Sequence, residues 1–233
     1  MKNNRRIIYG LILTIIAFLF AQLAGRTIQL NVDFLPYSFV THSAMLVLAI
    51  VLICSFKKYV NYKIAWPNFK KIWKPALFGF LSAVIVNGLL GAIGEACGIK
   101  QEAHFAFDVM SPLQVFLFIF ILASVAEETL FRGFLQNLLK PLSDKKIKLF
   151  KRNLTLPVFI AAIAFSLAHL ILITSDAGAY FIFRTLAFTF VLGLIAGYYQ
   201  EKYDNNAYAI IVHMSGNFMG LLGAIVGAFG FNV

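Results

Sequence analysis

The chain has 233 residues, of which 61% are hydrophobic and 13% are charged, and its formal net charge is +10. A soluble domain carries about a quarter charged residues, so the composition excludes an ordinary soluble protein and indicates a chain surrounded by lipid. The basic excess gives no sign of nucleic-acid binding, because it is concentrated in two short segments, 57–74 and 140–152, neither long enough for a folded basic face.

Long uncharged apolar runs follow one another along the chain, and runs of about 18 residues or more predict membrane spans. Seven such spans are predicted at about 7–24, 39–56, 74–97, 112–139, 157–173, 180–199 and 207–229. We therefore expect an all-α fold, a polytopic transmembrane helical bundle. It forms a single integral-membrane domain over 1–233, with three N-terminal spans in 1–111. The glycines in the last span predict either two short helices or one tightly packed helix.

The charges between the spans predict the orientation of the chain. Basic connections alternate with non-basic ones, and the connection after the third span is mixed, with Lys100, Glu102, His104 and Asp108. This alternation places the N-terminus in the cytoplasm and the C-terminus outside the cell membrane. The first apolar run is longer than the core of a signal peptide, so it is expected to remain as a helix. Cys54 and Cys97 then lie near opposite faces of the bilayer, which excludes a disulfide between them.

Three charged residues lie inside the fourth span, where a charge costs about 2.5–3.5 kcal/mol. Glu128 and Arg132 are four residues apart, so they can form an ion pair on one helix face. Glu127 lies about 100° around the helix and is free to point elsewhere. For Glu128 and Arg132 a structural bracing role is as well supported as a catalytic one, whereas for Glu127 we favour chemistry.

Two later spans add polar side chains at the same spacing. Phe165 and His169 share one face of the fifth span, and His213 and Asn217 share one face of the seventh. At 1.5 Å per residue, Glu127 and His169 lie roughly 20 Å from the cytoplasmic ends of their helices, Asn217 roughly 15 Å and His213 roughly 10 Å. These depths predict that the four residues converge on a hydrated pocket that opens toward the cytoplasm.

Such a pocket supports hydrolysis of an amide bond. A buried carboxylate and a histidine can activate water, and an imidazole with an amide can stabilise an oxyanion. No serine or cysteine has an evident nucleophile arrangement, and the HExxH motif is absent. No cofactor is required in this glutamate mechanism, although a zinc ion held by Glu127, His169 and His213 is chemically acceptable.

The three motifs, in this order on successive spans, resemble those of the CAAX protease and bacteriocin-processing family, also called the Abi family, and of type II CAAX prenyl endopeptidases. The resemblance covers about residues 112–229 and implies an intramembrane endopeptidase, in a family that often has eight spans. It implies that Glu127 with His169 activates water, that His213 and Asn217 stabilise the oxyanion, and that Glu128, Arg132 and Phe165 support them. The implied partners are membrane lipids and a peptide or membrane-protein substrate, lipidated or bacteriocin-like.

Two other functions fit a polytopic chain. A non-enzymatic membrane protein, such as a bacteriocin-immunity factor that acts by binding, would not depend on Glu127. A proton-coupled transporter would spread charged residues along a path across the bilayer. The first three spans offer little for such a path, with Glu95 at the end of one and His42 and Asn87 as the other polar candidates. Transport is therefore the weakest of the three.

Overall fold

The protein is described by a computed structural model that covers residues 3–102, 109–149 and 151–228. Within these ranges, seven helices are long and apolar enough to cross a membrane, which confirms the predicted bundle. They are α1 (Asn3–Thr27), α2 (Tyr37–Ser55), α3 (Phe69–Ala96), a central helix (Pro112–Gln136), α7 with its extension (Leu156–Ser175), α8 (Ala179–Tyr203) and α9 (Ala207–Ala228). His104, Asp108 and the last residue of the predicted seventh span lie outside the described residues.

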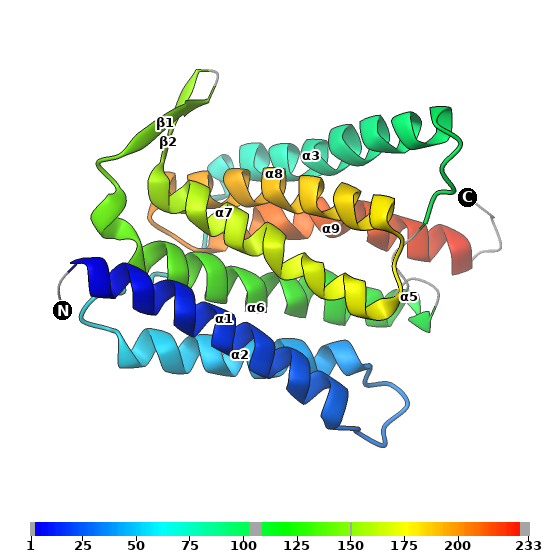
Figure 1. Cartoon of the computed structure of the whole chain (residues 1–233), viewed down its shortest axis with the longest axis horizontal. Coiled ribbons are helices and arrows are strands. Elements are labelled where there is room, and N and C mark those ends of the chain that lie inside the picture. The colour runs from blue at the N-terminus through cyan, green and yellow to red at the C-terminus, as the bar shows by residue number, and fades with distance from the viewer. Residues whose placement is uncertain (1–2, 103–108, 150, 229–233) are drawn as a thin grey trace.

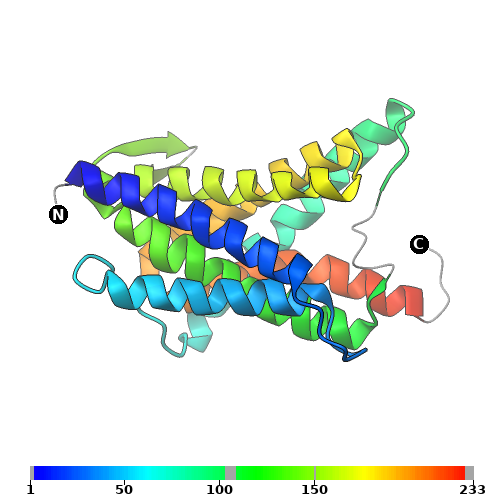
Figure 2. The same cartoon turned by 60° about the horizontal axis from the view of Figure 1, so that its bottom comes forward.

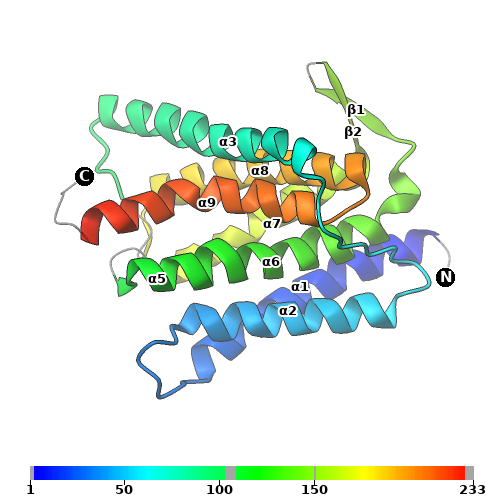
Figure 3. The same ribbon diagram turned by 180° about the vertical axis from the view of Figure 1, so that it is seen from behind.

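The helices run roughly along one direction and form three groups (Figure 1). Helices α1 and α2 pair on one side, and α3, α8 and α9 lie together on the other, with the central helix between the groups (Figures 1 and 3). Helix α7 packs on α8 and on the second half of the central helix. The beginning of α1 and the end of α9 lie at opposite ends of the bundle (Figures 1 and 2), as an odd number of spans requires.

The central helix is the most buried of the seven. It begins with a capping box in which the Ser111 and Gln114 side chains each accept a bond from the other residue's backbone N–H, and Pro112 occupies the first turn. The helix comprises α5 (Pro112–Gln114), a π-helical segment (Val115–Ala123), α6 (Ser124–Glu128) and a second π-helical segment (Thr129–Gln136). The two glutamates therefore lie in a short α-helical segment between wider turns, a kind of irregularity that is frequent at functional sites.

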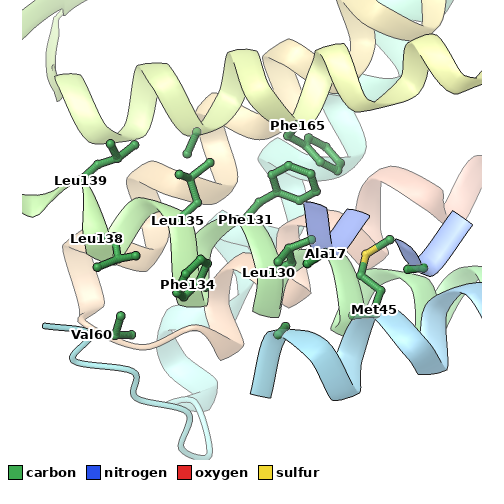
Figure 4. Packing of buried hydrophobic residues seen from close by; sticks show 14 residues of the cluster. Ala17, Met45, Val60, Leu130, Phe131, Phe134, Leu135, Leu138, Leu139 and Phe165 are labelled. Atoms are coloured by element: carbon green, nitrogen blue, oxygen red, sulfur yellow. The ribbon is translucent and has the colours of Figure 1, made fainter. Parts of the chain in front are cut away.

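A large apolar core fixes this helix against its neighbours (Figure 4). Leu130, Phe134 and Leu135 of the central helix are fully buried, as are Met45 of α2 and Ala21 of α1. Small residues on α1 and α2 allow close helix contact, which in a membrane is the main source of packing energy. The core lies on the side of the glutamates nearer the N-terminal end of the bundle.

The connection between the central helix and α7 contains a short antiparallel hairpin, which the sequence analysis did not predict. Strand β1 (Lys146–Leu149) pairs with β2 (Arg152–Thr155), with Lys146 opposite Thr155 and Leu149 opposite Arg152. The segment was interpreted as a basic loop. Its alternation of lysine with Ile147 and Leu149 fits the period of a strand.

The last span is one continuous helix, so the second of the two predicted alternatives is correct. Gly216 explains how it packs. A Cβ atom at this position would lie 2.7 Å from a methyl carbon of Leu192 on α8. The glycine thus permits the close approach of α8 and α9.

Candidate active site

The central helix presents Glu127 and Glu128 to different surroundings. Glu128 is fully buried and accepts a hydrogen bond of 2.9 Å from Nη1 of Arg132, which is also fully buried. The predicted ion pair is therefore present. The Glu127 side chain is 15% exposed and lines a cavity.

His213 of α9 lies between the two carboxylates. Its Nδ1 donates a hydrogen bond of 2.8 Å to Oε1 of Glu128, and its Nε2 is 3.8 Å from Oε2 of Glu127. The second distance exceeds that of a direct hydrogen bond. Arg132 and His213 thus both donate to Glu128, which orients the imidazole ring toward Glu127.

His169 marks the point where the α-helical part of α7 ends and a 3-10 segment begins. Its Nδ1 lies 2.9 Å from the backbone oxygen of Phe165. A carbonyl oxygen can only accept a hydrogen bond, so Nδ1 carries the hydrogen and Nε2 is left with a lone pair. The ring lines the same cavity as Glu127 and interacts electrostatically with that carboxylate.

The Phe165 ring connects these groups. Its centroid lies 4.5 Å from the guanidinium carbon of Arg132, 5.0 Å from the His169 ring and 5.4 Å from the His213 ring. Phe131 of the central helix packs against it edge to face at 5.2 Å (Figure 4). Phe165 is almost fully buried. It therefore holds the two histidines and the arginine at fixed separations and supplies a cation–π contact to Arg132.

Asn217 lines the cavity one turn beyond His213. Its amide nitrogen donates long hydrogen bonds, of 3.3 Å to Oγ of Ser124 and 3.5 Å to the backbone oxygen of Ile119. The structure thus brings all seven predicted site residues together around the two glutamates. Asn217 is directed toward an earlier turn of the central helix.

His42 of α2 also belongs to this cluster and was not predicted as a site residue. Its Nε2 lies 3.4 Å from Oε1 of Glu127, whereas Nε2 of His213 lies 3.8 Å from the other oxygen of that carboxylate. One sign of it was present in the sequence, since His42 was one of two polar candidates inside the first three spans. No local pattern linked it to a residue 85 positions away.

The cavity beside Glu127 has a volume of about 860 Å³. Its lining residues fall within 18–29, 36–42, 83–87, 109–131, 165–175, 181–192 and 213–220. Each of these stretches runs from the middle of the bundle toward the end opposite the N-terminus. The prediction that the N-terminus and the opening of the pocket lie on the same side is wrong, because the lining residues lie toward the other end of the bundle.

Within residues 3–102, 109–149 and 151–228, no three histidine, cysteine, aspartate or glutamate side chains form a group that could hold a metal ion. A zinc ion held by Glu127, His169 and His213 therefore stays a prediction.

Comparison with known proteins places the motif-bearing half of the chain. Residues 109–219 match the family model described as type II CAAX prenyl endopeptidase Rce1-like. This part of the chain is similar to the Rce1-like family. The resemblance drawn from the three motifs is thereby confirmed, and the match supports a membrane protease of the CAAX type. The Rce1-like segment contains the central helix, α7, α8 and the first half of α9.

The chain is similar to an uncharacterized 24.3 kDa protein of Escherichia coli, with 26% identity over 194 residues that cover 80% of each chain. No solved structure matches. The first three helices, which contribute His42, lie outside the Rce1-like segment.

Proposed function

We propose that the protein is an intramembrane endopeptidase that cleaves a peptide or membrane-protein substrate with a water molecule activated by Glu127 and His169. The observation that carries the proposal is the difference between the two glutamates. Glu128 accepts hydrogen bonds from Arg132 and His213. Glu127 instead faces a cavity that is lined by three imidazoles. Only Glu127 can therefore reach a substrate.

In the proposed reaction, Glu127 takes a proton from a water molecule in the cavity, and His169 accepts a hydrogen bond from the same water at its unprotonated Nε2. The hydroxide oxygen bonds to the carbonyl carbon of the substrate, whose oxygen becomes an oxyanion. When the tetrahedral intermediate collapses, the carbon–nitrogen bond breaks. The proton held by Glu127 passes to the departing amine.

The oxyanion is stabilised by donors from α9. His213 donates Nδ1–H to Glu128 and directs Nε2 into the cavity as the first donor. The amide of Asn217 supplies a second donor. Two donors of this kind typically contribute about 10²–10³ in rate each. Arg132 balances the negative charge of Glu128. Among the described residues, Glu127 is then the one carboxylate of the site without a cationic side chain paired to it in this way.

The mechanism needs no cofactor, and we propose the metal-free form. The orientation remains part of the proposal. With the N-terminus in the cytoplasm, the cavity faces the outer half of the membrane. The substrate is then a peptide or a membrane-protein segment, with or without a lipid anchor, that reaches the site from that side.

The test compares peptides in membranes of cells that carry wild type, Glu127→Gln or Glu95→Gln. Glu95 is an exposed glutamate near the end of α3 and does not line the cavity, so it is a matched control for loss of a carboxylate. We expect mass spectrometry to detect products in wild type and Glu95→Gln that are missing in Glu127→Gln. A cell phenotype that survives Glu127→Gln without any product would favour an immunity factor that acts by binding.

A further inference from the structure

His42 occupies the buried face of α2 at the level of the candidate site. Met45 and Ala49 follow it at helical spacing and are fully buried against the core, whereas Val47, Ile50 and Val51 are more than 45% exposed. The face that carries His42 is thus turned toward the central helix. This places an imidazole from the N-terminal half of the chain beside a glutamate of the Rce1-like segment.

A close contact between α1 and α2 fixes this position. A Cβ atom on Gly25 of α1 would overlap the side-chain oxygen of Thr41 and lie 3.4 Å from its Cα. The glycine therefore lets α2 approach α1 closely, directly beside His42. Since small residues at a helix crossing allow tight packing in lipid, the depth and rotation of α2 are well determined at this point.

The hydrogen bonds of His42 determine which nitrogen carries hydrogen. Its Nδ1 lies 2.7 Å from the backbone oxygen of Ser38, and a carbonyl oxygen can only accept. The hydrogen is thus on Nδ1, and in a neutral ring Nε2 would have only a lone pair. Yet Nε2 faces Oε1 of Glu127 at 3.4 Å, and an ionised carboxylate is also only an acceptor.

Two acceptors do not remain in contact without a hydrogen between them. The contact is favourable when one proton lies between Nε2 of His42 and Oε1 of Glu127, on either atom. The other carboxylate oxygen, Oε2, lies 3.8 Å from Nε2 of His213. The pairing with His42 thus leaves Oε2 as the oxygen available to a water molecule.

From this geometry, and given the proposed endopeptidase function, we infer that His42 is a positioning residue for Glu127. It holds Oε1 through a shared proton and directs Oε2 toward the water and His213. The N-terminal helices are then part of the site, which is incomplete in the Rce1-like segment alone. His42 acts through Glu127 and does not itself contact the substrate bond in this assignment.

Kinetics of four purified variants in detergent micelles test this role. His42→Phe keeps a ring of similar size without nitrogen, and His42→Gln keeps an N–H that can reach Oε1. Met45→Leu changes the same face of α2 one turn away, and Glu127→Ala removes the base. The probe is an internally quenched peptide in which the fourth residue from the C-terminus is an S-farnesyl cysteine.

We expect His42→Phe to lower kcat about 10- to 100-fold with KM changed less than about twofold, because the base is misdirected while the cavity remains. We expect His42→Gln to keep most of the turnover and Met45→Leu to match wild type. Full turnover by His42→Phe, with Glu127→Ala inactive, overturns the inference and leaves the proposed function intact. An active Glu127→Ala overturns the proposed function itself. Equal losses in His42→Phe and His42→Gln together with a lower unfolding temperature assign a merely structural role, which also overturns the inference.

A second measurement needs no substrate. The chain contains four histidines, so ¹⁵N-histidine NMR of the protein in micelles gives a small set of ring signals, and the signal lost in His42→Gln identifies His42. We expect Glu127→Gln to shift the Nε2 resonance of His42, since the shared proton is lost. An Nε2 resonance that does not move overturns the contact, whatever the peptide assay gives.

Discussion

At the scale of single residues, the site depends on how two adjacent glutamates are compensated. Glu128 has two strong donors, Arg132 and His213, at 2.9 and 2.8 Å. Arg132 is less well satisfied, because in the described part of the chain its Nε and Nη2 have no hydrogen-bond partner. The ring of Phe165 at 4.5 Å is the group that faces the guanidinium instead. The pair therefore stabilises the site mainly by preventing an uncompensated buried charge.

This balance predicts the effect of removing the cation. Arg132→Met leaves the Glu128 carboxylate buried without its main partner, which should lower the free energy of unfolding by about 3–5 kcal/mol. The double variant Glu128→Gln/Arg132→Met removes both charges and should recover a large part of that loss. Denaturant unfolding in micelles, followed by circular dichroism, measures both. An unchanged midpoint in Arg132→Met would show that the pair carries no such role.

Asn217 offers a test of the proposed oxyanion donors. Its hydrogen bonds are long, 3.3 and 3.5 Å, so Asn217→Ala should change the free energy of unfolding by less than about 1 kcal/mol. Turnover should fall about 10²–10³-fold, because a donor to the transition state is lost. Asn217→Asp has nearly the same shape but places a negative charge near the oxyanion, so it should be at least as impaired. Retention of turnover in Asn217→Asp would indicate a purely structural role.

At the scale of helices, the position of α9 depends on its contact with α3. Gly79 of α3 lies where an added Cβ would overlap the backbone oxygen of Val212 and lie 3.0 Å from its carbonyl carbon. Val212 directly precedes His213. The spacing of the two helices therefore sets where the imidazole lies relative to Glu127 and Glu128.

A matched pair of glycines on α3 tests this contact. Gly79→Ala must separate α3 from α9, because the neighbour is backbone and cannot rotate away. It should cost about 1–3 kcal/mol of stability and reduce peptide cleavage. Gly88→Ala is the same substitution on the same helix with nothing within 4 Å of the new atom, so it should be neutral or slightly stabilising. Equal behaviour of the two variants in unfolding and cleavage would contradict this account.

At the scale of helices, local sequence patterns predicted some features of the structure and not others. Spans and ion-pair spacing are local properties, so the seven helices, the Glu128–Arg132 pair and the faces that carry His169 and His213 followed from apolar runs and from residues four apart. His42 did not, because its contact with Glu127 depends on how α2 is rotated against the central helix. The hairpin at Lys146–Thr155 was not predicted, because a basic segment between spans was sufficiently explained as a cytoplasmic loop.

At the scale of the whole molecule, the orientation in the membrane decides which compartment the cavity faces. The charge alternation that predicts a cytoplasmic N-terminus depends on loops, and the position of the cavity depends on the packing of helix halves. Local sequence patterns gave the first and could not give the second.

Two native cysteines report on the orientation. Cys54 lies near the end of α2 and Cys97 just after α3, at opposite ends of the bundle, and both are free and exposed. With a cytoplasmic N-terminus, a membrane-impermeant maleimide added to intact cells should label Cys97, and Cys54 should react after permeabilisation. Cys54→Ser and Cys97→Ser assign each signal. Labelling of Cys54 in intact cells would reverse the orientation and place the cavity on the cytoplasmic side.

The cavity is closed at its inner limit. Its lining stops at Phe131 and Leu192, and beyond them Phe134, Leu135 and Leu138 fill the space toward the N-terminal end. Under the proposed peptidase function, neither fragment can leave past these buried side chains. A fragment held next to them would compete with the next substrate and slow successive turnovers.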